Sequence, residues 1–338
     1  MYEILVCKMY IFVQWAHIFN LFFLRDETNA HRIRRTHAMS ALLSVATALR
    51  RVPVLRPARS MKRARVARHA TASASAGAYV PGGPIENATV VVTGANRGIG
   101  LEFVTQILAK HDGNAVVACC RDPESADELM DVQLKVGPER LAITSLDVSD
   151  ENSIGNWAAN LSSVEPIASR GGVVDVVINN AGTTGTDGYN KWELEDMDAE
   201  EMMHVFKINT VGPLLVTQQL LKNGLIGDRS ARGKGGALVG NVTSKVGSVD
   251  DNGSGKGYAY RASKAALNIV NKSMSIDLED RNVRCLLLHP GWVRTRMTEG
   301  RGLIDADESA RGLLAAMEGA FGEINGRWYD YKGDEIPW

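Results

Sequence analysis

The sequence predicts a single α/β domain built on one doubly wound parallel sheet of about seven strands, with helices on both faces. Three observations predict it. A short β-branched apolar run at residues 88–92 suits a buried strand, a glycine-rich turn follows it, and an amphipathic pattern then leads to a second apolar run at residues 115–120. This order of strand, turn, helix and strand is that of a parallel βαβ unit.

The alternation of strands and helices continues beyond the first unit. Further strands are predicted at residues 141–146, 173–178, 237–242 and 283–288. Helices are predicted at residues 125–135, 153–161, 202–221 and 260–278. Gly, Ser and Asp predominate at 228–236 and 250–257, which predicts loops. Because parallel sheets bind ligands at the carboxyl ends of their strands, we expect the functional residues in the segments that follow them.

Composition divides the chain into two parts. Residues 1–84 hold 13 of the 38 Lys and Arg residues but only 3 of the 39 Asp and Glu residues, which leaves residues 85–338 acidic. We therefore predict a targeting or disordered N-terminal region, 1–84, ahead of one globular domain, 85–338. The acidic balance of the domain argues against a nucleic-acid partner.

The N-terminal region carries two kinds of targeting signal. Residues 9–24 are apolar but short and interrupted by polar side chains, so they fit a signal-type segment better than a stable membrane span. Residues 28–85 contain no acidic residue and are rich in Arg, Ser and Ala, as in organelle transit peptides. We expect a plastid or mitochondrial location. The alternatives are a nuclear-type basic cluster, a functional arm, a true start at Met39 and a cytoplasmic location.

Neither the cysteines nor the histidines predict a metal site. The four cysteines form no paired pattern, and the adjacent Cys119 and Cys120 lie in an apolar run, which favours buried thiols over ligands. His204 and His289 have no partner at ligand spacing on a shared helix face, so a structural role is the simpler interpretation.

The glycine-rich turn predicts a dinucleotide site. Glycines allow a tight turn and a close backbone approach, and the N-terminus of the following helix offers N–H groups to a pyrophosphate. The residues of the turn that we expect to bind the cofactor are Thr93, Gly94, Asn96, Arg97, Gly98, Ile99 and Gly100.

Tyr260 and Lys264 are four residues apart within a predicted helix, so both side chains can reach one ligand. A phenol is a poor acid at neutral pH, but a nearby ammonium group lowers its pKa. An isolated pair of this kind is most simply an exposed helix face, and only the other motifs give it a functional meaning.

Those motifs, spread over residues 87–338, resemble the classical short-chain dehydrogenases/reductases. The matching features are TGxxxGxG at 93–100, Asp147-Val148, NNAG at 179–182, Asn209, Ser244, Tyr260, Lys264 and PGxVxT at 290–295. The stretches SKVGSVDDN, YRASKAALN and WYDYKGDEIPW resemble, more narrowly, the C-factor-type (sniffer-like) carbonyl reductases.

The resemblance implies a Rossmann-type fold and an NAD(P)-dependent enzyme that acts on carbonyl or CH–OH groups. Tyr260 would protonate the carbonyl oxygen, and Lys264 would bind the nicotinamide ribose and lower the pKa of Tyr260. Ser244 would hydrogen-bond the same oxygen, and Asn209 would steady a water that leads protons away through Lys264. The remaining implied cofactor contacts are Asp147, Val148, Asn180, Ala181, Gly182, Pro290, Gly291, Val293 and Thr295.

Some assignments have rivals within the sequence. Thr243 could take the place of Ser244 or merely end the strand, and Asn209 could simply bond nearby backbone. Tyr258 lacks a lysine four residues later and is expected to line the pocket. Trp292 fits either the substrate pocket or core packing.

Charge predicts the choice of cofactor. NAD-preferring folds place an acidic residue at the end of the second strand, where this chain has Arg121. Arg121 and Arg97 could pair with a 2′-phosphate, which predicts NADP(H). Asp122 could take the acidic role, so NAD(H) stays possible.

We therefore expect an NADP-dependent carbonyl reductase acting on a small-molecule carbonyl or alcohol. The alternatives are an NADP(H)-binding regulatory or signalling protein and an extended-type epimerase or dehydratase, although the region after Thr295 is short for a second domain. Residues 296–309 are polar and suggest a modest substrate lid. The helices at 202–221 and 260–278 are broadly apolar, and such helices pair between subunits in the resembling family, which implies a homodimer or homotetramer.

Overall fold

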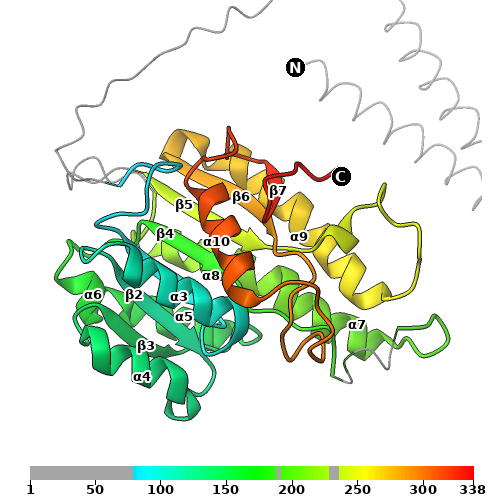
Figure 1. Ribbon diagram of the computed structural model, residues 1–338, viewed down its shortest axis with the longest axis horizontal. Helices are drawn as coiled ribbons and strands as arrows, with labels where there is room; N and C mark the ends of the chain where they lie inside the picture. Colours follow the sequence, from blue (N-terminus) through cyan, green and yellow to red (C-terminus); the bar gives the residue numbers. More distant parts are fainter. Residues whose placement is uncertain (1–78, 187, 189–191, 228–235) are drawn as a thin grey trace, which may run out of the picture. The chain divides into compact units, whose positions relative to one another are not determined.

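The computed structural model describes residues 79–338 except 187, 189–191 and 228–235. The described residues form a seven-stranded sheet in the order β3-β2-β1-β4-β5-β6-β7 (Figure 1), and every neighbouring pair is parallel. The predicted doubly wound α/β fold is confirmed. Residues 1–78 of the predicted targeting region and nearly all of the loop at 228–236 lie outside the described residues.

The strands follow the short apolar runs of the sequence. They are β1 (Thr89–Thr93), β2 (Ala115–Cys120), β3 (Leu141–Ser145), β4 (Val176–Asn179), β5 (Ala237–Val242), β6 (Val283–His289) and β7 (Trp328–Asp330). Every residue of β1, β2 and β5 is buried, as expected of strands covered on both faces. β4 begins three residues later than the apolar run that predicted it.

Most helices match the predicted segments. Those of the described residues are α3 (Gly98–Lys110), α4 (Asp127–Val136), α5 (Glu151–Asn160), α6 (Glu165–Ala168), α7 (Ala199–Phe206), α8 (Gly212–Lys222), α9 (Tyr258–Asp277) and α10 (Ala306–Met317). Of these, α6 and α10 were not predicted. The helical segment predicted at 202–221 is confirmed, but a π-helical turn at Lys207–Val211 divides it into α7 and α8. The last four residues of the polar segment at 296–309 belong to α10, and the lid itself stays a prediction.

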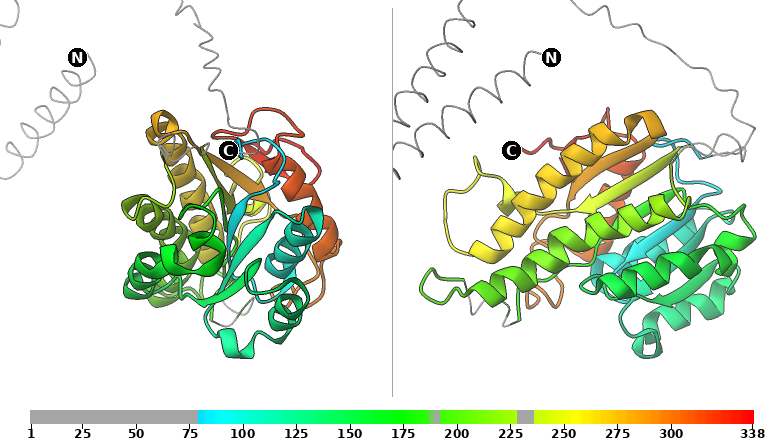
Figure 2. Two further views of the ribbon diagram at one scale, coloured as in Figure 1. Left: turned by 90° about the vertical axis from the view of Figure 1, so that its left-hand side faces the viewer. Right: turned by 180° about the vertical axis from the view of Figure 1, so that it is seen from behind.

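The helices form two layers, one on each face of the sheet (Figure 2). Phe103 of α3, Leu129 of α4 and Leu313 of α10 belong to one buried apolar cluster. The other face is covered by a second cluster, to which Trp157 of α5 and Leu220 of α8 contribute. α9 joins this second layer. Each layer buries the apolar stripe of its helices against the sheet, which stabilises the fold and fixes the strand ends.

The strand order reverses between β1 and β4, which pair in the middle of the sheet. β2 and β3 lie on one side of this pair, and β5, β6 and β7 lie on the other. The carboxyl ends of β1 and β4 therefore form the crevice in which doubly wound sheets bind ligands.

We find no helix with both the length and the apolar character needed to cross a bilayer in the described part of the chain. The apolar segment at residues 9–24 lies outside that part.

Candidate active site

The ends of β1 and β4 are joined by a compact set of hydrogen bonds. The Thr93 hydroxyl accepts from the backbone N–H groups of Asn180 at 3.0 Å and Ala181 at 3.1 Å. In return, the Asn180 amide donates to the carbonyl oxygens of Thr93 and Gly94, both at 3.0 Å. These four residues, all predicted to contact the cofactor, hold the crevice in one shape.

Two glycines of the turn stand where no side chain fits. A Cβ atom on Gly94, whose φ is +64°, would lie 2.9 Å from the Cα of Ala181. A Cβ atom on Gly100 would lie 2.2 Å from the Gly94 carbonyl oxygen. The backbone can therefore approach a ligand closely at the start of α3, where unpaired N–H groups favour phosphate. The residues present thus fit the pyrophosphate of a dinucleotide, and Asn96 lies half-buried in the same turn.

Positive charge gathers beside this turn. Burial lowers the pKa of Arg97, and the charges of Arg296 and Arg121 lower it further. Asp147 lies within the field of Arg121. Burial acts to raise the pKa of Asp147, but hydrogen bonds from Ser149 and the charges of Arg121 and Lys207 bring it below its usual value.

Asp122, the rival acidic residue for the ribose, is engaged elsewhere. Its carboxylate accepts from the Ser125 hydroxyl at 2.5 Å, at the start of a short 3₁₀ turn. An acidic residue in such a local turn is less available to a ribose hydroxyl than one pointing into the crevice.

Lys264 is buried beneath the site. Its side chain is only 4 % exposed, and its ammonium group donates to the Val242 carbonyl oxygen at 2.9 Å. Burial lowers the pKa of Lys264 to about 8. The same ammonium lies 5.7 Å from the centroid of the Tyr260 ring, so the structure brings the predicted pair together on α9.

Asn209 lies in the π-helical turn, where its side chain is already bonded. Its oxygen accepts from the Thr183 N–H at 2.9 Å, and its amide donates to the Thr183 carbonyl at 2.8 Å and the Ser263 hydroxyl at 3.0 Å. π-Helical turns occur often at functional sites. A Cβ atom on Gly182 would lie 3.3 Å from the Asn209 oxygen and 3.7 Å from the Lys264 nitrogen, so the end of β4, α9 and this turn meet here.

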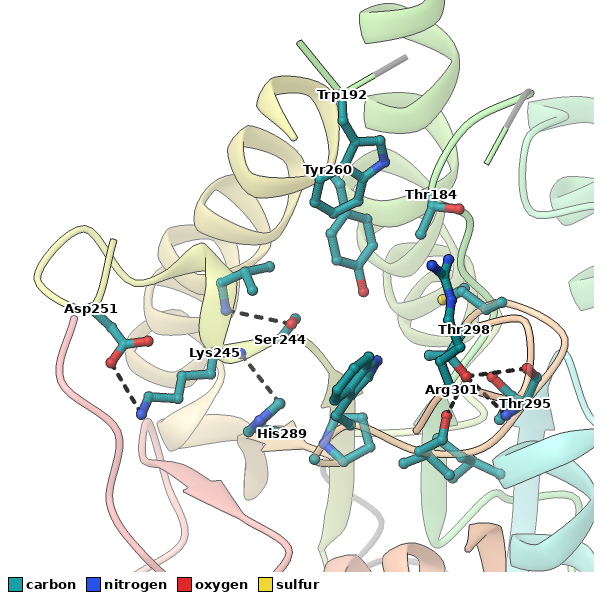
Figure 3. Close-up of a pocket in the computed structure, with 17 residues that line it drawn as sticks. Thr184, Trp192, Ser244, Lys245, Asp251, Tyr260, His289, Thr295, Thr298 and Arg301 are labelled. Atoms are coloured by element: carbon teal, nitrogen blue, oxygen red, sulfur yellow. Dashed lines mark hydrogen bonds and ion pairs between the residues drawn. The ribbon is translucent and has the colours of Figure 1, made fainter. Parts of the chain in front are cut away.

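A pocket of about 640 Å³ opens beside this cluster. In Figure 3 the Tyr260 hydroxyl and the Ser244 side chain, both in its lining, point toward its interior from different elements. Thr243, the rival of Ser244, is buried and donates instead to Asn268 of α9 at 2.7 Å. The predicted cofactor residues that also line the pocket are Ile99, Pro290, Gly291, Val293 and Thr295. Val148, in the segment after β3, packs against the start of α8, because a Cβ on Gly212 would lie 2.7 Å from the Val148 carbonyl oxygen.

His289 supports the wall that carries Ser244. Its Nδ1 accepts from the Lys245 N–H at 3.2 Å. Burial lowers the pKa of His289 to about 4, helped by the Lys245 charge and opposed by Asp330 and Asp251. His289 is therefore a neutral acceptor near pH 7. The Lys245 side chain pairs with Asp251 at 3.0 Å on the pocket rim (Figure 3).

Trp192 was not predicted as a site residue, because it lies in a polar loop without periodicity. Its ring centroid is 6.3 Å from that of Tyr260, and Figure 3 shows it above the tyrosine. A Cβ on Gly257 would lie 2.5 Å from the Trp192 ring, so this glycine is required for the contact. Tyr258, predicted to line the pocket, is instead 40 % exposed and outside the lining, whereas Trp292 is part of it.

Comparison with known proteins identifies the family. The sequence model of the short chain dehydrogenase family matches residues 88–303. The C-signal protein of Myxococcus xanthus is 45 % identical over 170 residues, which cover 49 % of this chain and 94 % of that protein.

Solved structures agree with this assignment. The NADPH-bound carbonyl reductase from chicken fatty liver is 32 % identical, with a TM-score of 0.62 over 74 % of this chain and 98 % of that one. The carbonyl reductase Sniffer of D. melanogaster is 28 % identical, with a TM-score of 0.63 over 75 % of this chain and 100 % of that one. The predicted resemblance to the C-factor and sniffer-like group is confirmed, and the chain belongs to the short-chain dehydrogenase family of NAD(P)-dependent oxidoreductases.

Proposed function

We propose that the protein is an NADPH-dependent carbonyl reductase. The observation that carries this proposal is the convergence of the Tyr260 hydroxyl and Ser244 on one pocket, next to a buried Lys264 and the glycine turn. A carbonyl oxygen held between the two hydroxyl groups would have its carbon directed toward the cofactor crevice.

Each residue then has a distinct task. A bound NADPH supplies the hydride for the carbonyl carbon. Tyr260 donates a proton to the oxygen as negative charge develops there, and Ser244 stabilises the same charge with a hydrogen bond. Lys264 binds the ribose and favours the phenolate that remains after proton transfer. Apolar walls that include Trp192 limit the access of water.

The Lys264 ammonium is also suited to return a proton to the Tyr260 phenolate. Since burial lowers its pKa to about 8, it can lose and regain a proton near neutral pH at little cost. The water predicted beside Asn209 stays a prediction. The contacts of the Asn209 side chain support a positioning role, because they tie Thr183 and Ser263 to the π-helical turn.

We also propose a preference for NADPH over NADH. The nearby guanidinium groups of Arg97 and Arg121 suit a 2′-phosphate. The hydrogen bond from Ser125 occupies Asp122, the acidic residue that would otherwise favour the 2′-hydroxyl of NADH. Arg121→Ala should lower kcat/KM for NADPH about tenfold and change that for NADH little, measured by cofactor absorbance. A wild-type enzyme that favours NADH, and still does so after Arg121→Ala, would refute the preference.

The pocket supports an apolar or aromatic carbonyl compound as substrate. Trp192, Trp292 and Met297 line it, and its volume of about 640 Å³ suits a small molecule beside the part of the cofactor that shares the pocket. A screen of aldehydes and ketones that follows NADPH absorbance tests the function directly. Turnover of apolar ketones supports the proposal, whereas NADPH binding without turnover of any carbonyl contradicts it.

The second outcome would favour an NADP(H)-binding signalling protein, the alternative suggested by the name of the C-signal relative. The presence of Ser244, Tyr260, Lys264 and Asn209 together in one site argues against it, since binding alone does not need a proton donor.

For the chain as a whole, we propose that residues 1–84 form a removable plastid or mitochondrial targeting region ahead of a catalytic domain at 85–338. Fusing residues 1–84 to a fluorescent reporter tests this, and a diffuse cytosolic signal would contradict it.

We also propose a homodimer or homotetramer, since α9 exposes Ile269 and Ile276, each 64 % accessible. Light scattering would show a monomer if this is wrong.

A further inference from the structure

The loop at residues 292–301 lies between the cofactor turn and the substrate pocket. A Cβ atom on Gly98 would lie 3.4 Å from the Thr295 methyl group, so the loop packs against the first residue of α3. Thr298 holds the loop in shape, because its hydroxyl donates to the Val293 carbonyl at 2.6 Å and accepts from the Thr295 N–H at 3.1 Å. Arg296 follows Thr295 directly and is therefore placed at the edge of the glycine turn.

The arginines of this loop differ in whether they form an ion pair. Arg294 pairs with Asp305 at 2.6 Å, and Arg301 pairs with Glu299 at 2.7 Å. Arg296 makes no ion pair among the described residues. It is nevertheless placed beside Arg97, because Thr295, which precedes Arg296, packs against Gly98, which follows Arg97. The charges of Arg296 and Arg121 both act to lower the pKa of Arg97.

Arg97, Arg121 and Arg296 thus converge from the glycine turn, the end of β2 and the loop. Within the described residues, none of the three guanidinium groups has a carboxylate at salt-bridge distance. Neighbouring like charges repel one another, and an anion placed among them turns that cost into a favourable interaction. Guanidinium groups bind phosphate in a bidentate manner, and the adjacent start of α3 favours the same ligand.

We propose that Arg296, on the loop at residues 292–301, is a third guanidinium contact to a phosphate group of the dinucleotide. This inference rests on the proposed use of NADP(H). The same loop carries Met297, Thr298 and Arg301 into the lining of the pocket. Binding of the cofactor phosphate therefore also anchors one wall of the substrate pocket.

The test is the dissociation constant of NADPH and of NADH for the full-length wild-type protein, Arg296→Ala and Arg296→Glu, measured by titration calorimetry. Arg296 is exposed, so we expect both variants to fold, and thermal unfolding checks this. Arg296→Ala should weaken NADPH binding about tenfold, and Arg296→Glu should weaken it further. The control is Arg311→Ala, which removes the same charge from α10, where Arg311 pairs with Asp307 at 2.9 Å. It should leave both affinities unchanged.

The two cofactors distinguish the phosphate groups. A loss confined to NADPH assigns Arg296 to the 2′-phosphate, and an equal loss for both assigns it to the pyrophosphate; either supports the inference. Unchanged affinity in both Arg296 variants, or an equal loss in Arg311→Ala, would overturn it while leaving the proposed function intact. A wild-type protein that binds neither nucleotide would refute the proposed function, and this inference with it.

Discussion

The two sides of the site are built by different means. On the cofactor side, backbone and small side chains meet so closely that Gly94 and Gly100 cannot accept a single carbon atom. On the substrate side, the pocket is lined by large side chains such as Trp192 and Trp292, and Trp292 is 51 % exposed. The shape of the cofactor side depends on positions where no side chain fits. The shape of the substrate side depends on large side chains that can be replaced by others. Binding of the cofactor should therefore be fragile to small changes, whereas substrate choice should be adjustable.

Tyr260→Phe should have the largest effect on activity, because Tyr260 belongs to the chemistry that both sides serve. Loss of the proton donor should lower kcat by about 10²- to 10⁴-fold. The ring that lies near Lys264 is retained, so the NADPH dissociation constant should stay within about twofold. Steady-state kinetics and a cofactor titration measure the two quantities. Tyr258→Phe is the matched control and should behave as wild type; equal losses in both variants would remove Tyr260 from its role.

Lys264 should reveal its burial through the pH dependence of stability. Its folded pKa of about 8 lies below the ordinary lysine value of 10.5, so between these pH values the unfolded chain binds a proton that the folded chain lacks. Stability therefore rises with pH across this window and should gain up to about 3 kcal/mol from this group. Lys264→Met should lose that rise and be more stable than wild type near pH 7, although inactive.

Chemical denaturation of the cofactor-free protein at a series of pH values measures this difference. Parallel pH curves for wild type and Lys264→Met would show that the burial of Lys264 carries no such cost.

Gly100→Ala tests the steric side. The new methyl group would lie 2.2 Å from the Gly94 carbonyl and 2.6 Å from the Asn180 amide, so the turn must move. We expect a loss of about 1–3 kcal/mol in the free energy of unfolding and weaker NADPH binding. Gly155→Ala is the control, because nothing lies within 4 Å of its Cβ position on α5. It should be neutral or stabilising; the same loss at Gly155 would point to a general effect of removing glycine.

Trp292→Ala tests the adjustable side and should have the smallest effect on the protein itself. We expect KM for a bulky ketone to rise several-fold through lost apolar contact, about 1 kcal/mol, with little change in melting temperature or NADPH affinity. Kinetics with one bulky and one small carbonyl substrate make the comparison. A loss of cofactor affinity as large as that of Gly100→Ala would erase the distinction between the two sides.

The cofactor side of the site is easier to predict from the sequence than the substrate side, for a physical reason. The turn at 93–100 and the Tyr260–Lys264 pair depend on local spacing, which a sequence displays directly. Trp192 contacts Tyr260 only because a polar loop folds back toward α9, and no periodic pattern in the sequence predicts that contact. Arg296 was likewise invisible, since its neighbour Arg97 is distant in the chain.

Several elements of the fold were not predicted from the sequence, each for its own reason. The three-residue edge strand β7 is too short to show an alternating pattern. α10 has a helical pattern, with buried Ala310, Leu313, Leu314 and Met317, but its acidic first turn continues the polar segment before it and hides its start. The π-helical turn around Asn209 depends on its tertiary bonds to Thr183 and Ser263, which spacing alone does not predict.

A crystal structure of the complex with NADP⁺ would test the proposed roles of Tyr260 and Lys264 at the atoms that carry them. We predict that the Lys264 ammonium hydrogen-bonds the nicotinamide ribose and that the Tyr260 hydroxyl faces the reacting carbon of the nicotinamide ring, with Ser244 beside it. A complex in which Tyr260 is turned away from that ring, or in which Lys264 bonds only the Val242 carbonyl, would contradict this prediction.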